Sequence, residues 1–392
     1  MIQNLLRPEV QDFINVNLDK DVTKLALTKN PFEDVTWTEI INQIAAKQKA
    51  KTKLPTWFAT KNIIFPAKLS IEQTSSEITA QYKASLISGD SIIDLTGGFG
   101  VDDFYFAKYF KEVVHCELNQ ELSTIVTQNV NTFELSNFQC IAGDSTEIIE
   151  KLNKKFDWIY VDPSRRNDAK GKVFMLKDCL PNVPELLNFY FNYSNSILIK
   201  NSPILDISLA ISELNFVKNV YIIALENEVK EFLLELEKDY KGTIHIHTVN
   251  LSKNGNQFFN HTIEDDLHVS FSEPKQYVYE PNAAIMKSGL FNALANQLNL
   301  CKLHQHSHLY TSDVLLDNFP GRSFKIEQNF EFNKQNANMY LKGKKMNLAT
   351  RNFNLSVDEL KKKYKILDGG LVYTFATTTL TNQKTILICS KI

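Results

Sequence analysis

Short apolar runs rich in β-branched residues alternate with amphipathic stretches between residues 91 and 249. Short apolar runs are typical of buried strands, whereas apolar positions three and four apart are typical of helices. Strand and helix in alternation predict an α/β fold, a doubly wound and mostly parallel sheet with helices on both faces. The predicted strands are 91–95, 112–118, 138–142, 156–161, 196–200, 220–225 and 243–249, and the predicted helices are 101–110, 120–135, 145–153, 175–193, 206–215 and 228–240.

The residues before this region, 1–88, have a helical pattern. Apolar positions recur three and four apart over 37–49 and 75–87, and prolines separate the segments. We therefore expect an N-terminal helical region that ends where the first strand begins.

The pattern changes again after about residue 270 and predicts a small α+β module. Helix 356–364 has the signature of a capping box, with Ser356 before its first turn and Glu359 three residues later. Turns are expected at 368–370 and 381–383. The other predicted elements are strands 276–280, 301–310, 323–332, 346–353, 371–378 and 384–390, and helix 283–299.

Composition narrows the class of protein. Of the 392 residues, 43% are hydrophobic and 22% charged, which excludes a largely disordered chain. No apolar run approaches the roughly 18 residues of a membrane span, and Arg7 and Glu9 interrupt the segment where a signal peptide would be apolar. The cysteines are odd in number, far apart and never spaced as Cys-x-x-Cys. We expect a cytoplasmic protein with reduced cysteines that binds neither membrane nor metal.

The net charge of −2 conceals an uneven distribution. Residues 321–392 carry 13 basic and 5 acidic side chains, a net of +8, whereas residues 89–320 have a net of −12. A basic end is typical of proteins that bind polyanions, although a lysine-rich solvated surface gives the same count. Both interpretations stay open for the lysines of the last predicted helix, Lys361, Lys362, Lys363 and Lys365.

The most informative stretch is 94–103, DLTGGFGVDD, which lies directly after the first predicted strand and before a helix. Nucleotide cofactors bind at this edge of a doubly wound sheet. Gly97, Gly98 and Gly100 let the backbone pass close to a ligand, and the turn leads into a helix N-terminus. We expect a nucleotide-binding turn here.

Acidic residues end the next two predicted strands. Glu117, 20 residues after Gly97, is placed to accept ribose hydroxyls, and Asp144 is placed to meet an adenine amino group. A nicotinamide dinucleotide is disfavoured because the third position of its glycine fingerprint is Asp103, whose carboxylate would repel a pyrophosphate. No Gly-Lys-Ser/Thr follows the glycines, so a P-loop is absent. The sequence predicts a pocket for another adenosine-containing ligand.

Asp94, four residues before Gly98, resembles the acidic start of motif I in class I S-adenosylmethionine-dependent methyltransferases. That motif usually reads Asp-x-Gly-x-Gly-x-Gly, and Thr96 replaces its first glycine here. The resemblance implies S-adenosylmethionine as the cofactor. The residues it places around this cofactor are Asp94, Thr96, Gly97, Gly98, Gly100, Glu117 and Asp144.

The fourth predicted strand is rich in aromatic residues and continues into Asp162 and Pro163. This sequence partly resembles the Asp-Pro-Pro-Tyr motif of amino-methylating enzymes, with Ser164 and Arg165 in place of the second proline and the aromatic residue. The resemblance implies that Asp162 and Pro163 are catalytic and lie beside the methyl donor, and that Arg165 contacts a phosphate or a base. The alternative is that Asp162-Pro163 merely ends a strand.

Three other features receive structural interpretations. Uracil carbon-5 methyltransferases carry a similar Asp-Pro-x-Arg motif and then a nucleophilic cysteine, but 200–203 contains none, so covalent catalysis is not expected. Cys179 falls in a predicted helix, where a buried apolar role is expected. His304, His306 and His308 alternate on a predicted strand, and we expect an exposed polar face there rather than a metal site.

Together with 65–84 and 351–366, these motifs resemble one bacterial family over essentially the whole chain. Its members are class I methyltransferases with a small ferredoxin-like domain followed by a C-terminal THUMP-like domain. The resemblance implies a Rossmann-like methyltransferase core and an RNA-directed appendage. It also brings residues before the first strand toward the pocket, unless they only form a helix surface: Gln73, Ser75, Ser76, Tyr82 and Lys83.

The predicted organisation has four parts. They are an N-terminal helical region (1–88), a class I methyltransferase domain (89–270), a ferredoxin-like domain (271–320) and a THUMP-like domain (321–392). We expect methyl transfer from S-adenosylmethionine to a nucleic-acid base, in particular a nitrogen of a tRNA or rRNA. A catalytically inactive RNA-binding scaffold and a methyltransferase acting on a protein or a small molecule remain as alternatives.

Overall fold

The computed structural model describes residues 2–165, 175–263 and 268–392, without the side chain of Arg165. The chain divides into two compact units, Met1–Lys218 with Leu233–Gly242, and Asn219–Phe232 with Thr243–Ile392. None of the described helices is long and apolar enough to cross a lipid bilayer.

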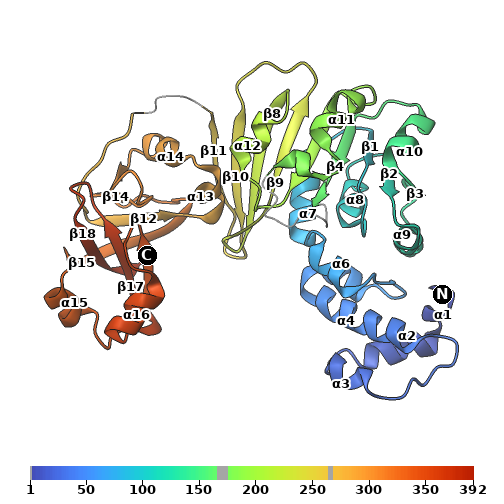
Figure 1. Cartoon of the computed structure of the whole chain (residues 1–392), viewed down its shortest axis with the longest axis horizontal. Coiled ribbons are helices and arrows are strands. Elements are labelled where there is room, and N and C mark those ends of the chain that lie inside the picture. The colour runs from blue at the N-terminus through green and yellow to red at the C-terminus, as the bar shows by residue number, and fades with distance from the viewer. Residues whose placement is uncertain (1, 166–174, 264–267) are drawn as a thin grey trace. The chain divides into compact units, whose positions relative to one another are not determined.

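The described residues before the first strand form helices joined by loops, as Figure 1 shows. The helices predicted over 37–49 and 75–87 are confirmed as α4 (Trp37–Lys53) and α7 (Glu77–Ala84). A capping box between Thr36 and Glu39 begins α4, and the Ser76 hydroxyl caps α7. The other helices are α1 (Ile2–Leu5), α2 (Pro8–Val16), α3 (Val22–Ala26), α5 (Pro55–Ala59) and α6 (Lys68–Gln73).

A parallel sheet forms the centre of the first unit, as the alternating pattern predicts. Strand β1 pairs in parallel with β2 and β4, β2 pairs with β3, and β4 pairs with β7. The strands are β1 (Ser91–Asp94), β2 (Glu112–Glu117), β3 (Phe138–Ala142), β4 (Trp158–Val161) and β7 (Ser196–Asn201). The helices that connect them are α8 (Val101–Phe106), α9 (Gln120–Thr132), α10 (Ser145–Leu152) and α11 (Val183–Tyr190), and α12 (Ile207–Ser212) follows β7.

The complete strand order of this sheet is β11-β10-β8-β9-β7-β4-β1-β2-β3. Strand β10 pairs in parallel with β8 and antiparallel with β11. The additional strands are β8 (Val217–Leu225), β9 (Glu228–Glu237), β10 (His245–Leu251) and β11 (Gln257–Thr262). Because β1, β2, β3, β4 and β7 are parallel, their carboxyl ends share one edge, where ligands bind in sheets of this kind.

The segment 228–240, predicted as a helix, forms strand β9, so that prediction is wrong. Six consecutive residues, 231–236, are buried in the sheet, and a strand covered on both faces shows no alternation of apolar and polar positions. Glu226 and Asn227 both have positive φ angles, 49° and 64°, as in the two-residue turns that join antiparallel strands. Pairing within the sheet thus overrides the helix propensity of this Glu- and Leu-rich segment.

The helix predicted over 175–193 begins only with Val183. Pro181 and Pro184 explain the late start, since proline is tolerated in the first turn of a helix but not in its interior. Before this helix lie a 3-10 turn (Leu176–Asp178) and the two short antiparallel strands β5 (Ser164–Arg165) and β6 (Cys179–Leu180). Cys179 therefore lies in a strand rather than a helix, although it is buried as expected, with 1% of its surface exposed.

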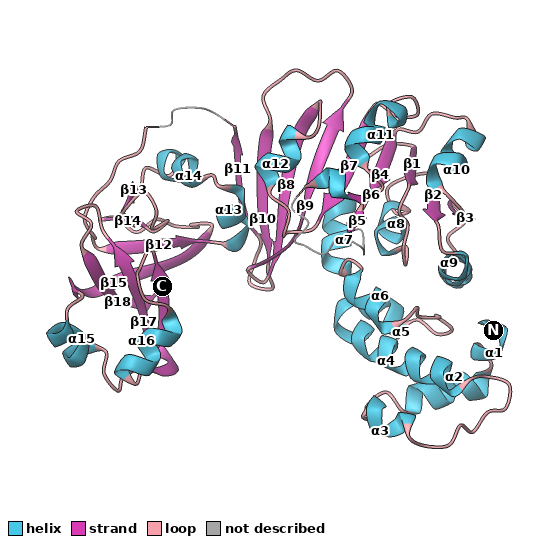
Figure 2. Cartoon of the chain, viewed as in Figure 1, coloured by secondary structure: helices cyan, strands magenta, loops and turns pink. Residues whose placement is uncertain are grey.

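A second sheet, in the second unit, has the strand order β13-β14-β12-β15-β18-β17-β16. Most of its strands are labelled in Figure 2. Its strands are β12 (Tyr277–Pro281), β13 (Cys301–Lys302), β14 (Tyr310–Ser312), β15 (Gly321–Glu331), β16 (Lys345–Arg351), β17 (Leu367–Thr378) and β18 (Lys384–Lys391). Its helices are α13 (Ala283–Ser288), α14 (Phe291–Gln297), α15 (Lys334–Tyr340) and α16 (Val357–Tyr364). The predicted capping box between Ser356 and Glu359 is present at the start of α16.

Three local predictions in this part of the chain need correction. Gly289, with a φ of 75°, ends α13 and divides the helix predicted over 283–299 into two. The turn predicted at 368–370 lies inside β17, where the pairing with β16 shifts register and the two glycines have positive φ. The segment 304–308 is a turn rather than a strand, so its histidines do not share a strand face.

Candidate active site

Thr96 joins the ends of two neighbouring strands at the carboxyl edge of the first sheet. Its backbone N–H and its hydroxyl both donate hydrogen bonds to Asp94 Oδ1, at 2.7 and 3.0 Å. The same hydroxyl oxygen accepts a hydrogen bond of 2.6 Å from the backbone N–H of Asp162. The residue that departs from the usual glycine motif therefore connects the two predicted motifs.

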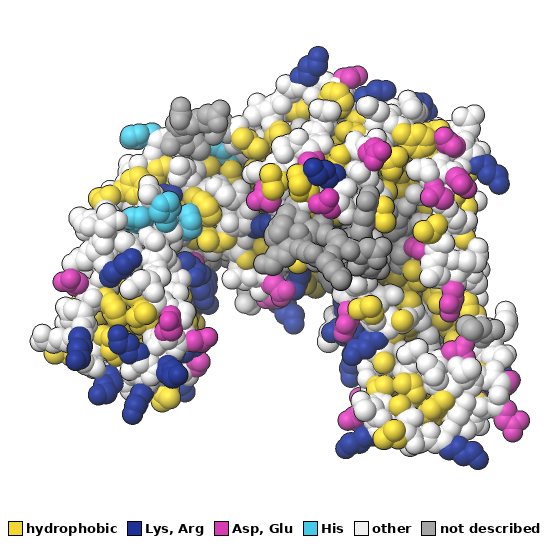
Figure 3. All heavy atoms as spheres, in the orientation of Figure 1, with side chains coloured by type: hydrophobic (Ala, Val, Ile, Leu, Met, Phe, Trp, Pro, Cys, Tyr) yellow, Lys and Arg dark blue, Asp and Glu magenta, His cyan; other side chains and the backbone are white. Residues whose placement is uncertain are grey.

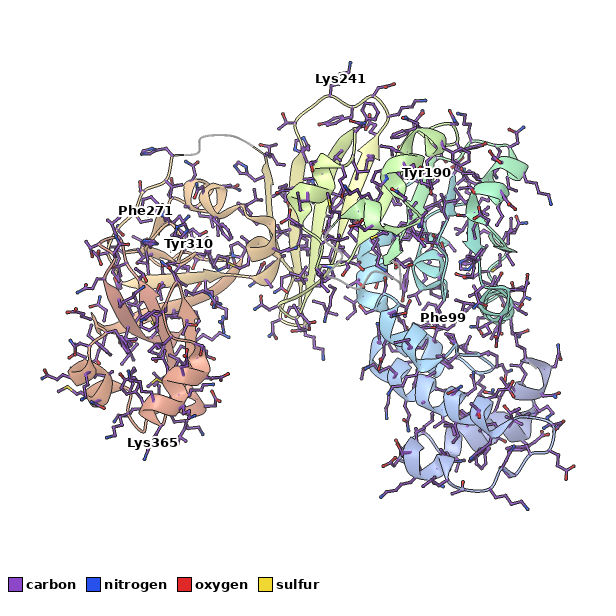
Figure 4. The ribbon with its side chains drawn as sticks, in the orientation of Figure 1. Phe99, Tyr190, Lys241, Phe271, Tyr310 and Lys365 are labelled. Carbon is purple, nitrogen blue, oxygen red and sulfur yellow. The ribbon has the colours of Figure 1, made fainter. Side chains whose placement is uncertain are left out.

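The glycines of the turn differ in what surrounds them. A Cβ on Gly97 would lie 2.1 Å from Cε1 of His115, so only glycine fits there. Gly98 and Gly100 have φ angles of 57° and 72°, which favour glycine. A Cβ on Gly98 would have nothing closer than the Thr96 carbonyl oxygen at 3.8 Å, so this point of the turn is open to a ligand. Phe99, labelled in Figure 4, packs against Trp57 of α5 with ring centroids 6.3 Å apart.

A buried cluster of ionisable groups lies beneath the turn. His115 Nδ1 lies 2.7 Å from Asp103 Oδ2, and both side chains are fully buried. Burial, and then the neighbouring carboxyl groups, raise the pKa values of Asp94 and Asp103 well above their ordinary range. Burial also lowers the pKa of His115. These shifts favour the uncharged forms, so the cluster supports the turn without a fixed charge.

Glu117 and Asp144 stand at the ends of β2 and β3, as predicted. Glu117 accepts hydrogen bonds from the backbone N–H groups of Gly98, at 2.9 Å, and Asn119, at 2.7 Å. Asp144 caps α10 by accepting hydrogen bonds from the N–H groups of Thr146 and Glu147. Hydrogen bonding, chiefly from the Thr146 side chain, lowers the pKa of Asp144 and keeps it ionised. Both carboxyl groups therefore lie on the same side of β1, at the ends of the two strands that follow it in the sheet.

Asp162 follows β4 and pairs with a lysine that the sequence did not indicate. Lys200, near the end of β7, donates to Asp162 Oδ2 at 2.5 Å. The Asp162 side chain is 38% exposed, whereas that of Lys200 is 11% exposed. Pro163 follows as a partly buried residue, and the backbone of Arg165 lies in β5. The predicted contacts of the Arg165 side chain lie outside the described part of the chain.

A network of buried polar groups surrounds Lys200. Asp102 of α8 lies 3.9 Å from the Lys200 ammonium and 3.2 Å from that of Lys83. It also accepts hydrogen bonds from the Tyr160 hydroxyl, at 2.8 Å, and the Ser75 hydroxyl, at 3.1 Å. Burial acts to raise the pKa of Asp102, but the two ammonium groups and the two hydroxyl donors lower it overall. Asp102 is therefore held as a carboxylate inside the protein.

Two of the five residues expected to approach the pocket reach this network. Ser75 and Lys83 contact Asp102, and Lys83 donates to the Ser75 hydroxyl at 3.0 Å. Ser76, by contrast, serves as the N-cap of α7. The alternative, in which this segment only forms a helix surface, does not describe Lys83, which has no exposed surface.

The residues at this edge fit S-adenosylmethionine. The turn is open at Gly98, and Glu117 and Asp144 follow the next two strands, where their carboxyl groups suit the hydroxyl and amino groups of an adenosine. Glycine is required at 97 by contact with His115 and favoured at 98 and 100 by positive φ.

The C-terminal residues match two family models. Residues 277–320 match a ferredoxin-like domain, and residues 321–391 match a THUMP domain-like family. No curated protein sequence matches the chain.

Several solved structures are similar to parts or all of this chain. TrmK of M. capricolum with bound S-adenosyl-homocysteine is 16% identical, with 41% of this chain and 68% of that chain covered and a TM-score of 0.33. A protein called a putative RNA methyltransferase from Pyrococcus horikoshii is 15% identical, with coverages of 57% and 98% and a TM-score of 0.30. A protein called a putative methyltransferase from Porphyromonas gingivalis W83 is 28% identical over 99% of this chain and 98% of that chain, with a TM-score of 0.87.

The full-length likeness and the two domain matches agree with the motifs. The chain has a class I methyltransferase fold followed by ferredoxin-like and THUMP-like domains. The fold class and the resemblance predicted from the sequence are thereby confirmed. The boundaries at residues 88, 270 and 320 stay predictions.

Proposed function

We propose that the chain transfers the methyl group of S-adenosylmethionine to a nitrogen of an RNA base. The observation that carries the proposal is the hydrogen-bonded connection from Asp94 through Thr96 to Asp162. It joins the motif that would hold the methyl donor to the motif that would hold the acceptor.

The glycine turn and two carboxylates would hold the donor. The backbone at Gly97, Gly98 and Gly100 would lie along it, Glu117 would accept its ribose hydroxyls, and Asp144 would meet its adenine amino group. Each carboxylate already accepts backbone hydrogen bonds, but a carboxylate has about four acceptor positions and retains capacity for a ligand. When bound, S-adenosylmethionine supplies an electrophilic methyl group on a sulfonium.

Asp162 would align the acceptor nitrogen. Its carboxylate is part-exposed, so a substrate can reach it, and it accepts hydrogen bonds but donates none while ionised. A hydrogen bond from the attacking amine to this carboxylate, or to the carbonyl of the Pro163 turn, would direct the nitrogen lone pair toward the methyl group. Arg165 is proposed to contact a phosphate or to stack on a base.

The basic C-terminal domain would bind the RNA. Lys362, Lys363 and Lys365 are exposed on or just after α16, and Lys365 is labelled at the tip of its side chain in Figure 4. Lys361 instead pairs with Asp368 at 2.5 Å. In Figure 3 several basic side chains are visible on the face of the C-terminal domain that the view shows. Exposed lysines in a region of net charge +8 suit the phosphates of a cytoplasmic tRNA or rRNA.

Donor binding is tested by titrating the full-length protein with S-adenosylmethionine in a calorimeter. We expect Asp94→Ala and Glu117→Ala each to weaken binding more than tenfold. Glu121→Ala is the matched control, because Glu121 is an exposed carboxylate on α9, close in sequence to Glu117. Absence of binding by the wild type contradicts the proposal.

Methyl transfer is tested with labelled S-adenosylmethionine and total RNA from a strain that lacks the protein. Label should enter RNA with the wild type and disappear with Asp162→Ala. RNA binding without incorporation identifies the inactive scaffold that the residues Thr96, Ser164 and Arg165 suggest. Label in a protein or small-molecule fraction, but not in RNA, identifies another substrate class. Mass spectrometry of nucleosides from strains with and without the protein then identifies the base.

A further inference from the structure

We infer that Lys200 is a positioning residue that fixes the Asp162 carboxylate as a pure hydrogen-bond acceptor, so that the site selects a nitrogen that carries a proton. The inference rests on the proposed function. It concerns a lysine that no motif indicated, and it narrows the acceptor to exocyclic amines and to ring nitrogens of N–H groups.

Lys200 stands between two carboxylates of different exposure. One is Asp162 at 2.5 Å, whose side chain is 38% exposed, and the other is Asp102 at 3.9 Å, whose side chain is 10% exposed. An exposed carboxylate rotates between rotamers unless a partner fixes it, and side-chain entropy then opposes any single orientation. An ammonium group that is itself only 11% exposed removes that freedom for Asp162.

Asp102, the second carboxylate near Lys200, is itself held by other side chains. Lys83 lies 3.2 Å away, and the Tyr160 and Ser75 hydroxyls donate to it. Charges therefore alternate along the series Lys83, Asp102, Lys200, Asp162, from the fully buried end to the part-exposed end. The side chain of Asp162, at 38%, is the most exposed of the four, so it is the one that a substrate can reach.

An ionised carboxylate at this position restricts the nucleophile. It accepts a hydrogen bond from an N–H group but offers no proton to a bare ring nitrogen. In the reaction, the nitrogen lone pair forms the N–C bond to the methyl group while the C–S bond breaks, leaving its electron pair on sulfur. The proton of that nitrogen passes to Asp162 and from there to water.

The test assays the full-length protein, with labelled S-adenosylmethionine and total RNA from the deletion strain as substrates. We expect Lys200→Met to lower kcat about 100-fold, the loss typical of a misplaced reacting group, with little change in the calorimetric affinity for S-adenosylmethionine. Lys200→Arg should recover part of the loss, because it restores the charge. Lys151→Met, an exposed lysine on α10, is the matched control and should retain wild-type kcat.

The fold should survive Lys200→Met, because Asp102 keeps Lys83 and two hydroxyl donors, while Asp162 gains water. A thermal unfolding midpoint near that of the wild type checks this. The decisive measurement is a double-mutant cycle with Asp162→Asn. If Lys200 acts through Asp162, its replacement lowers kcat little further in the Asp162→Asn background.

The outcomes separate the two proposals. An inactive wild type overturns the proposed function itself. If the wild type is active, three results overturn the role of Lys200 alone. They are wild-type kcat in Lys200→Met, no recovery in Lys200→Arg, and losses in kcat that multiply in the double variant. Nucleosides methylated on carbon or on a nitrogen without a proton overturn the inferred selectivity.

Discussion

Replacing Gly97 by alanine would force a clash inside the candidate donor site. The added Cβ would lie 2.1, 2.2 and 2.6 Å from Cε1, Nδ1 and Nε2 of His115, whereas real Cβ contacts essentially never fall below 3.0 Å. The loop or the imidazole must therefore move by about 1 Å or more to relieve the overlap. Neither group moves easily.

Hydrogen bonds hold both sides of the clash. The Gly97 N–H donates to the Cys116 carbonyl at 2.8 Å, and the His115 ring pairs with Asp103 at 2.7 Å. Overpacking costs about 1 to 3 kcal/mol, and separating a buried hydrogen-bonded pair costs about 1 to 3 kcal/mol more. We therefore expect Gly97→Ala to lower the free energy of unfolding by about 2 to 6 kcal/mol and to weaken donor binding.

Urea unfolding and calorimetric titration with S-adenosylmethionine measure these effects. Gly98→Ala is the control in the same turn: its φ of 57° strains an alanine, but no atom opposes the Cβ within 3.8 Å, so a loss of about 1 to 2 kcal/mol is expected. His115→Ala removes the opposing ring, so the double variant should be less destabilised than the sum of the single ones. Wild-type stability of Gly97→Ala, or strict additivity in the cycle, refutes the reasoning.

Three further predictions concern other parts of the chain. Thr96→Val should lower stability by about 1 to 3 kcal/mol, because the Asp162 N–H loses its acceptor, whereas Thr96→Ser keeps the hydroxyl and should unfold like the wild type in urea. Charge reversal of the three exposed lysines, by Lys362→Glu, Lys363→Glu and Lys365→Glu, should flatten the dependence of log RNA affinity on log salt concentration by about 0.7 to 0.9 per lost contact. The affinity for the methyl donor should not change. An unaltered slope assigns these lysines to a solvated surface. Burial, followed by nearby positive groups, lowers the pKa of His308 to about 4. The unfolded chain, in which the pKa of a histidine is about 6.5, therefore binds a proton at higher pH than the folded chain does. The free energy of unfolding should then fall as pH drops from about 6.5 to 4. His308→Asn should show a smaller fall in urea titrations at several pH values.

The parallel part of the first sheet could be predicted from the sequence because each of its strands is a short apolar run. Strand β3 spans 138–142, the predicted range, and β1 and β2 differ from prediction by one residue. The order in which those runs occur also places Asp94, Glu117 and Asp144 at the same edge. The location of a residue directly after a strand is enough to predict that it lies at this edge, because parallel strands place their carboxyl ends at the same edge of the sheet.

Strand β9 and the polar network could not be predicted in this way. The buried residues 231–236 lack a period of two, so the pattern over 228–240 gave no sign of a strand. Lys83 and Lys200 are far apart in sequence but both lie next to Asp102, an association that no local pattern encodes. The sequence did contain one weaker indication of a partner for Lys200. This lysine follows the apolar residues of a predicted strand, and a charged residue that is buried there needs a partner.

Thr96, which replaces a motif glycine, and Lys200, which no motif indicated, both act on Asp162. Thr96, in place of a glycine, accepts a hydrogen bond from the backbone N–H of Asp162, and Lys200 pairs with its side chain. The first contact fixes where the Asp162 main chain lies relative to the glycine turn, and the second fixes where its carboxylate lies. A glycine at 96 would remove the first contact. The threonine is therefore better explained as part of a site that holds Asp162 in place than as a sign of lost catalysis.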